Sequence, residues 1–253
     1  MANGIYVAVS GSIAKLDQLD VIANDLANAK TPGYKHDTVT FESVRADLEN
    51  AVAAGDIDID AVVDKDFVQA TDTFARLSQG PLQRTSNPLD VALVGNGFLR
   101  VQSERGERLT RDGRMMLGRD GTLRTLRGQA VLDMRGRRIK IPPAVTPEIA
   151  LDGTIRDNGR PIAQLGIRAV DPEARLLKDR EGLFTPEPQA AGAQPQPPIA
   201  NAWEVMQGYL EQSNASAVRL MTELIEVQRN FEALHQVINT NSTMDRTATR
   251  LTG

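Results

Sequence analysis

The heptad spacing of apolar residues near the C-terminal end most constrains how this chain can fold. Two series of mainly apolar residues recur there every seven positions. The first is Trp203, Leu210, Ala217, Leu224, Phe231 and Ile238, and the second is Met206, Ser213, Leu220, Val227, Leu234 and Asn241. No Pro or Gly interrupts residues 209–251. Sustained heptads are typical of long helices that pack along a narrow seam. We therefore expect a helix over residues 214–250, preceded by an extended or helical lead-in at 203–212.

The N-terminal end repeats this pattern in a shorter form. One series is Val9, Leu16 and Ala23, and the other is Ile5, Ser12, Leu19 and Leu26. The spacing predicts an amphipathic helix of about 25 residues. We expect the helix to end before Pro32 and Gly33, because a proline disfavours helical geometry in the preceding residue and a glycine permits a turn.

The centre of the chain has the pattern of short strands. Residues 89–94 and 98–101 are predicted strands on either side of a tight turn at Gly95-Asn96-Gly97. Asp-Gly and Asn-Gly pairs, which are strong turn signals, recur between residues 112 and 159. Turns at this density predict short antiparallel strands from residue 80 to 185.

These patterns predict an α+β chain with a mostly β centre and helical ends, in which the two terminal helices pack together as a coiled coil. The expected domains are a discontinuous helical domain over 1–34 and 203–253, an extended connector over 35–80, an all-β outer domain over 81–185 and a Pro/Gln-rich linker over 186–202.

Composition excludes several kinds of chemistry. Cysteine is absent, which rules out disulfides, thiolate catalysis and Cys-ligated metals. The two histidines, His36 and His235, are expected to be surface or packing residues. The sequence has no phosphate-binding loop, nucleophile elbow, zinc-protease motif or EF-hand. We therefore expect a protein that is not an enzyme, with no catalytic, cofactor-binding or metal-binding residues.

Hydropathy and charge add further limits. No run of 18 apolar residues exists, so no membrane span is expected. No basic residue precedes the apolar stretch at the N-terminus, so no cleavable secretory signal is expected. The net charge of −4 argues against nonspecific nucleic-acid binding.

Charge is unevenly distributed along the chain. Residues 1–80 carry a net charge of −7 and residues 81–140 a net charge of +7. A run of arginines stands out in the basic segment: Arg105, Arg108, Arg111, Arg114, Arg119, Arg124 and Arg127. The run has three interpretations, namely a solvated face of hairpins, a contact with an acidic neighbouring subunit, and a polyanion site. Phe98 is the only aromatic residue near the run, which disfavours nucleic acid because base stacking needs aromatic side chains.

Three motifs, in order along the chain, resemble the rod and hook proteins of the bacterial flagellum. They lie at residues 19–35 (LDVIANDLANAKTPGYK), at 89–98 with 109–113 (LDVALVGNGF and LTRDG), and at 207–214 with 224–232 (QGYLEQSN and LIEVQRNFE). The residues that carry the resemblance are Asn24, Leu26, Ala27, Asn28, Thr31, Pro32, Gly33, Tyr34, Gly95, Gly97, Phe98, Gln207, Gly208, Leu210 and Asn214.

The resemblance implies a structural subunit of the periplasmic basal-body rod that leaves the cytoplasm through the flagellar type III export apparatus. The terminal helices would form an inner tube and the β domain an outer layer. The implied partners are copies of the chain, other proximal and distal rod proteins, neighbouring ring components and, in transit, the export apparatus.

The implied assembly seam lies on the two terminal helices. It comprises Ile5, Val9, Leu16, Leu19, Ala23, Leu26, Leu210, Ala217, Leu220, Leu224, Val227, Phe231, Leu234 and Ile238. Neighbouring subunits would also bury Ile13, Val21, Ile22, Met221 and Ile225 beside it.

Within the family, residues 1–11 are more similar to the proximal-rod type than to the distal-rod type. Two other classes of function remain as alternatives. A binding module with a coiled-coil stalk would need an exposed aromatic or Asp/Asn cluster, and none is evident. An enzyme acting on peptidoglycan would need two positioned carboxylates or a metal site, and no motif marks one.

Overall fold

The computed structural model describes residues 2–45, 66–142, 146–171, 176–179, 182–186 and 203–252. The chain divides into two compact units. The helical unit comprises Met1–Leu26, Asp37–Thr73 and Ala217–Gly253, and the β-rich unit comprises Ala27–His36 and Phe74–Ser216. The predicted combination of two terminal helices with a centre of short antiparallel strands is confirmed.

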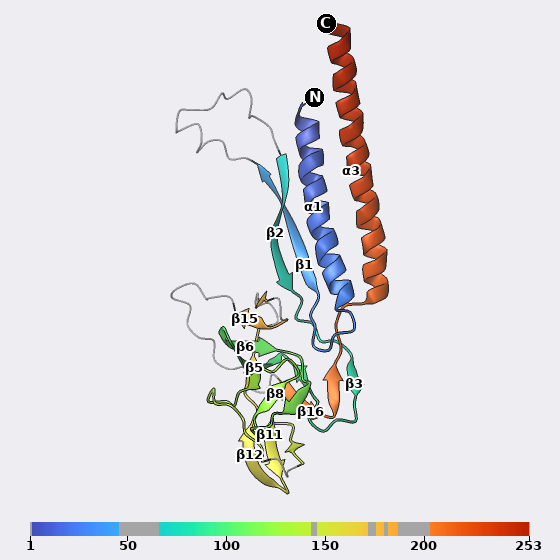
Figure 1. Ribbon diagram of the computed structural model, residues 1–253. Coiled ribbons are helices and arrows are strands. Elements are labelled where there is room, and N and C mark those ends of the chain that lie inside the picture. The colour runs from blue at the N-terminus through green and yellow to red at the C-terminus, as the bar shows by residue number, and fades with distance from the viewer. Residues whose placement is uncertain are drawn as a thin grey trace, which may run out of the picture. The chain divides into compact units, whose positions relative to one another are not determined.

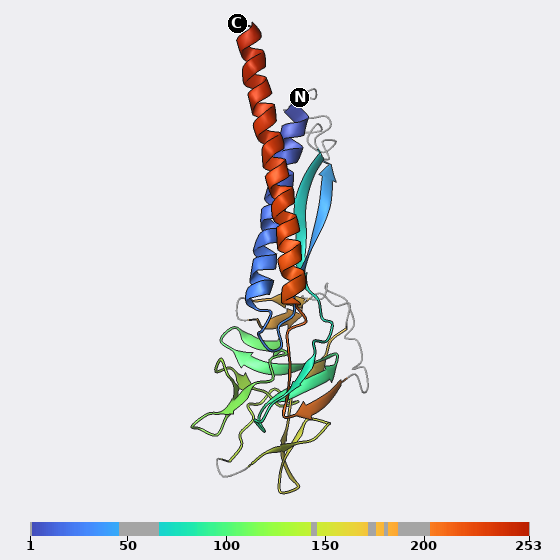
Figure 2. The same ribbon diagram turned by 90° about the vertical axis from the view of Figure 1, so that its right-hand side faces the viewer.

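Two long helices dominate the helical unit. Helix α1 spans Ala2–Ala27 and helix α3 spans Ala217–Thr252, and they lie side by side in both views (Figures 1 and 2). Helix α1 ends at a turn in which the Thr31 amide donates to the Asn28 carbonyl at 2.9 Å, just before Pro32 as the sequence predicts. Neither helix, over the residues described, is long and apolar enough to cross a membrane.

The helical unit also holds most of a two-stranded sheet formed by β1 (Asp37–Arg45) and β2 (Asp66–Ala75). Buried Asp25 connects the end of α1 to the start of β1. Its two carboxylate oxygens accept hydrogen bonds from the Asp37 amide at 3.1 and 3.2 Å. A carboxylate that accepts backbone N–H groups in this way can be buried without an unpaired polar atom.

Over the residues that the structure describes, the β-rich unit has fifteen short strands. They are β3 (Leu82–Arg84), β4 (Val91–Gly95), β5 (Gly97–Ser103), β6 (Gly106–Thr110), β7 (Met115–Leu117), β8 (Leu123–Thr125), β9 (Ala130–Val131), β10 (Glu148–Ile149), β11 (Thr154–Asp157), β12 (Arg160–Gln164), β13 (Ile167–Ala169), β14 (Leu176–Lys178), β15 (Phe184–Pro186), β16 (Trp203–Gln207) and β17 (Tyr209–Glu211).

The described strands of this unit form four sheets. The largest has the order β14-β15-β6-β5-β9-β8-β7, with β13 also paired to β5, and a smaller one has the order β10-β11-β12. Two further sheets are single pairs, β16-β4 and β17-β3. Strands β4 and β5 do not pair with each other, so the predicted turn at 95–97 carries the chain from one sheet to the next.

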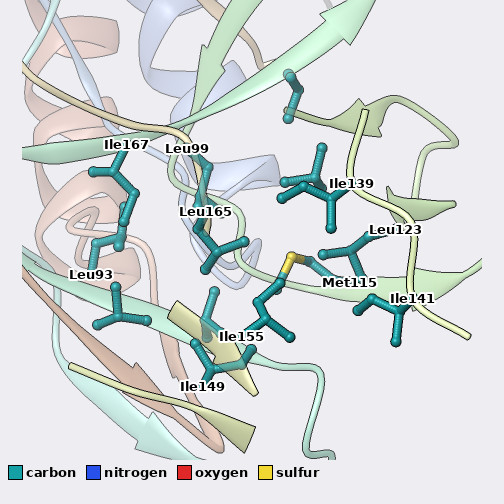
Figure 3. Close-up of a cluster of buried hydrophobic side chains, with 14 of the residues drawn as sticks. Leu93, Leu99, Met115, Leu123, Ile139, Ile141, Ile149, Ile155, Leu165 and Ile167 are labelled. Carbon is teal, nitrogen blue, oxygen red and sulfur yellow. The ribbon is translucent and has the colours of Figure 1, made fainter. Parts of the chain in front are cut away.

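The main core of the β-rich unit is aliphatic (Figure 3). Its buried members include Leu99, Val101, Leu123, Ile155 and Leu165, each 0% exposed. Burial of such a side chain contributes roughly 1.5–3 kcal/mol. A second cluster contains Phe98 and Phe184, whose rings meet edge to face at 5.5 Å. A core of this composition explains how the chain folds with only 4% aromatic residues.

The lead-in to the C-terminal helix is extended. Trp203–Gln207 and Tyr209–Glu211 form strands β16 and β17, so Leu210 lies outside the helix that carries the rest of the C-terminal seam. Gly208, with a φ of +75°, separates the two strands. The heptad spacing continues through this segment, but pairing with β4 and β3 outweighs it.

Candidate functional site: the motif junction and the helix faces

The three motif segments come together in the β-rich unit. The first segment, Thr31–Lys35, follows α1. The second, Leu109–Gly113, includes the end of β6, and the third, Gln207–Asn214, includes β17. We call the place where they meet the motif junction, and define it by the buried residues Gly33, Lys35, Arg111, Gly113 and Glu211.

Glu211 is the centre of the motif junction. Its side chain is 0% exposed, and oxygen Oε1 accepts from Lys35 Nζ at 2.5 Å and from the Gly80 amide at 2.8 Å. Oxygen Oε2 accepts from Arg111 Nη1 at 3.1 Å. The backbone carbonyl of Glu211 accepts from the Gly33 amide at 2.8 Å. One residue of β17 therefore connects segments that are far apart in the chain.

The two cations of the junction both pair with the Glu211 carboxylate. Lys35 also donates to the Ser78 carbonyl at 2.8 Å, and Arg111 to the carbonyls of Leu93, at 2.8 Å, and Gly95. Burial lowers the pKa of the Lys35 ammonium and of the Arg111 guanidinium, and the Glu211 carboxylate opposes both shifts. Enclosed charges of this kind are tolerated only when each is paired and hydrogen-bonded.

Two glycines allow the backbones at the junction to approach closely. Gly33 has a φ of +70°, and a Cβ there would lie 2.3 Å from the Asp112 amide nitrogen. A Cβ on Gly113 would lie 1.7 Å from the Val91 carbonyl oxygen. No other residue type fits at either position without moving the backbone, so the predicted turn at Asp112-Gly113 is in fact a point of close packing.

Asn214 and Gln207 hold the flanks of the junction through their amide groups. Asn214 Oδ1 accepts from the His36 amide at 2.8 Å, and its Nδ2 donates to the Arg76 carbonyl at 2.8 Å. Gln207 Nε2 donates to the Pro88 and Pro147 carbonyls at 2.8 and 2.7 Å. Both motif residues therefore satisfy backbone groups of distant segments.

Two aromatic motif residues contact cations. The Phe98 ring centre lies 4.8 Å from the guanidinium carbon of Arg111, and the Tyr34 ring centre lies 3.7 Å from Lys178 Nζ. Lys178 also donates to the Lys35 carbonyl at 2.9 Å. Contacts of this kind between a cation and an aromatic face are attractive, and they connect β5 and β14 to the junction.

The remaining motif residues lie around the end of α1 and the turn at 95–97. Asn24 and Ala27 are on the exposed side of α1, whereas Leu26, Asn28, Thr31, Pro32 and Gly95 are half-buried and Gly97 and Leu210 are buried. Asn24 and Leu26 belong to the helical unit and do not take part in the motif junction.

The junction has the chemistry of a structural element. Its single carboxylate is neutralised by two cations and has no solvent exposure. Among the described residues, no group of three or more His, Cys, Asp or Glu side chains could hold a metal ion.

On α3, the predicted seam residues occupy the least exposed stripe. Leu220 and Val227 are buried, and Ala217, Leu224, Phe231, Leu234 and Ile238 are half-buried. The Leu234 side chain approaches Gly11 of α1, where a Cβ would lie 3.5 Å from Leu234 Cδ1. Gln18 Nε2 donates to Glu223 Oε1 at 3.4 Å across the same pair of helices.

On α1, the buried residues differ from those of the predicted seam. Its buried residues are Ala8, Ser12, Ala14, Ile22 and Asp25, whereas Val9, Ile13, Leu16 and Ala23 are exposed. Leu19 and Leu26 are half-buried, as is Val21, and the side chain of Ile5 lies outside the described residues. The Ser12 hydroxyl donates to the Ala8 carbonyl at 2.7 Å, so this small polar side chain is buried with its hydrogen bond made.

The arginine run is not one surface. Arg111 is buried at the motif junction, Arg114 pairs with Asp112 at 2.7 Å and Arg124 pairs with Asp120 at 3.2 Å. A solvated or intersubunit role is therefore wrong for Arg111, because its guanidinium neutralises Glu211 inside the chain. Sequence reasoning also missed Lys35 and Glu211 as site residues; the one available signal was their place inside the first and third motifs.

Comparison with known proteins supports the three-motif division. The model for the flagella basal body rod protein family matches residues 5–35. The D1 domain model of the flagellar hook protein FlgE/F/G family matches residues 92–160, and the C-terminal model of the flagellar basal body rod FlgEFG family matches residues 206–251.

Proteins that are similar to this chain over almost its whole length are also named flagellar basal-body rod proteins. The flagellar basal-body rod protein FlgF of Caulobacter vibrioides is 33% identical over 100% of this chain and 99% of its own length. FlgF of Salmonella typhimurium is 36% identical over 94% of this chain and 93% of its own length. The flagellar basal-body rod protein FlgG of Bacillus subtilis is 30% identical over 95% of this chain and 96% of its own length. The chain therefore belongs to the flagellar basal-body rod protein family, with most resemblance to its FlgF members, and is a structural component of the rod rather than an enzyme.

Proposed function

We propose that this chain is a subunit of the proximal part of the flagellar rod, and that it polymerises through its two terminal helices. Its partners would be copies of itself and other rod proteins, with ring components as neighbours. The chain would be exported unfolded by the flagellar type III apparatus. The helices within residues 1–34 and 203–253, namely α1 and α3, would then form a coiled-coil inner tube, and residues 81–185 a β outer domain.

The observation that carries the proposal is a pair of exposed apolar stripes on the helical unit. On α1, Ile13 is 56% exposed and Leu16 is 46% exposed. On α3, Val218, Met221 and Ile225 are 78%, 53% and 56% exposed at spacings of three and four residues, which places them on one face. Contiguous exposed apolar residues are typical of surfaces that a partner covers.

The apolar stripes favour other rod subunits as the partner. The family membership supports assembly with rod and hook components, and long helices with apolar stripes on more than one face can pack side by side in a bundle. The similarity of residues 1–11 to the proximal-rod type supports the proximal position. The distal rod is the alternative position, since relatives named FlgG also match the whole chain.

A charge placed on the exposed stripe tests polymerisation. We expect Ile225→Asp to leave the purified monomer as helical as the wild type, because Ile225 is exposed, but to abolish swimming and incorporation into basal bodies. Asn230→Asp is the matched control, since it adds the same charge at another exposed position of α3, and it should swim normally. Normal swimming by Ile225→Asp would show that this face is not covered in the rod.

Arg105, which is exposed, and Arg108, which is half-buried, give a second test. We expect Arg105→Glu combined with Arg108→Glu to weaken polymerisation, because residues 81–140 carry a net charge of +7 and residues 1–80 a net charge of −7, so neighbouring copies attract. Added salt should weaken wild-type polymerisation as well, by screening. Sedimentation of polymers measures both effects. Arg160→Glu, at an exposed position outside the basic segment, is the control, and polymerisation of the double variant at the wild-type level would contradict the attraction.

A further inference from the structure

Strands β16 and β17 are bound by the rest of the β-rich unit as an extended peptide is bound by a receptor. Strand β16 pairs antiparallel with β4 from Trp203 opposite Gly95 to Gln207 opposite Val91, and β17 pairs with β3. Within the described residues, β3 and β4 have no other strand partner. Removal of residues 203–211 would therefore leave both strands unpaired, which exposes backbone groups that need partners.

Every second side chain of β16, namely Trp203, Val205 and Gln207, packs against or hydrogen-bonds to the rest of the β-rich unit. Trp203 lies against Gly97, where a Cβ would come within 2.8 Å of the Trp203 Cβ. Val205 is 1% exposed in the aliphatic core. Gln207 Oε1 accepts from the Ile149 amide at 3.1 Å, in addition to the two bonds that its Nε2 donates. Glu204, which points to the other face, is exposed. Backbone pairing with pockets for alternate side chains is how proteins recognise extended peptides.

The carboxylate of Glu211 adds a charge requirement to this recognition. The receptor side offers it the Lys35 ammonium, the Arg111 guanidinium and the Gly80 amide, all buried. Without the carboxylate, two cations would remain inside the unit with no anion to neutralise them. The rest of the β-rich unit therefore needs an acidic residue at position 211 to pair with its buried cations.

We propose that the β-rich unit contains a peptide-binding socket for the chain's own segment 203–214, and that the socket strongly prefers a ligand with a carboxylate at position 211. The ligand is an extended peptide with an aromatic residue, an amide and a carboxylate at the spacing of Trp203, Gln207 and Glu211. The β-rich unit consequently cannot complete its fold until this late segment of the chain is available.

Competition with a separate copy of the segment tests the socket. A protease site is placed within residues 187–202 of the full-length chain, and the folded protein is cut there. The cut protein is then unfolded in urea and refolded with an excess of fluorescent peptide of sequence 203–214. We expect the peptide to co-elute with the protein. We expect uptake of the Glu211→Gln peptide to be at least tenfold weaker, and uptake of the Glu204→Gln peptide to equal that of the wild-type peptide.

The uncut chain is the second control. Its own segment is attached and has a high effective concentration, so it should take up at least tenfold less wild-type peptide than the cut chain. Absence of uptake by the refolded cut chain would overturn the proposal, as would equal uptake of the Glu211→Gln and wild-type peptides. Equal uptake by cut and uncut chains would place the peptide at a different site and would also overturn it.

Discussion

Glu211→Ala is expected to lower the free energy of unfolding of the β-rich unit by about 3–5 kcal/mol, the usual cost of removing one member of a buried ion pair. The effect is large because the substitution leaves Lys35 and Arg111 enclosed without an anion and leaves the Gly80 amide without its acceptor. Trp203 is the only tryptophan and lies in β16 of the same unit, so its fluorescence during urea unfolding reports the change.

Two further variants show whether charge is the cause. Glu204→Ala removes an exposed carboxylate from the neighbouring strand and should change the stability by less than about 0.5 kcal/mol, as is usual for surface substitutions. The triple variant Lys35→Met, Arg111→Met and Glu211→Met removes all three charges and should recover most of the loss, because apolar replacements of a buried ion cluster are often tolerated. A Glu211→Ala protein as stable as the wild type would contradict the role assigned to the motif junction.

The helices and the strand-rich centre could be predicted because their signals are local. The C-terminal heptads indicated a helix from 214 to 250, and α3 spans Ala217–Thr252. The N-terminal helix ends at the turn before Pro32 as expected, because a proline and a glycine act on their immediate neighbours. The dense turn signals likewise predicted short antiparallel strands.

Periodicity alone could not say which side of each helix would be packed within the chain. In α1, the series Val9, Leu16 and Ala23 is apolar, yet the structure exposes it and buries the smaller Ala8 and Ser12. Gly11 leaves room for the Leu234 side chain of α3, whereas the larger apolar residues Val9 and Leu16 remain exposed. When a helix has apolar residues on two stripes, the sequence does not distinguish the stripe for its own chain from the stripe for a neighbour.

The motif junction could not be predicted because its contacts are remote in sequence. Lys35 and Glu211 are 176 positions apart, and Arg111 and Glu211 are 100 apart. No local pattern distinguishes a lysine or arginine that will be buried from one on the surface, and charged residues are most often exposed. Trp203 and Leu210 also continue the heptad spacing of the C-terminal helix, although both lie in strands. These strands are too short to show an alternating pattern that would distinguish them from a helix.

A pair of adjacent substitutions in α1 should separate the folding of the helical unit from its assembly. Ile22 is 3% exposed, and Asp25, one turn away, is buried at 1% exposure. Ile22→Asp would put a second carboxylate into this interior, where desolvation and the like charge of Asp25 both oppose ionisation. We expect a loss of stability on the order of 3–5 kcal/mol. The helical signal of the purified monomer at 222 nm should fall, and the thermal transition of the helical unit should move to a lower temperature.

Ala23→Asp adds the same charge one residue later, on the exposed stripe of α1. Because that position faces away from the interior of the helical unit, the monomer should keep the helical signal and thermal transition of the wild type. If the stripe is covered by neighbouring subunits as we propose, cells with this variant should nevertheless fail to swim. Equal monomer stability of Ile22→Asp and wild type would contradict the packing of α1 described above, whereas a stable, motile Ala23→Asp would leave that packing intact and remove α1 from the polymer interface.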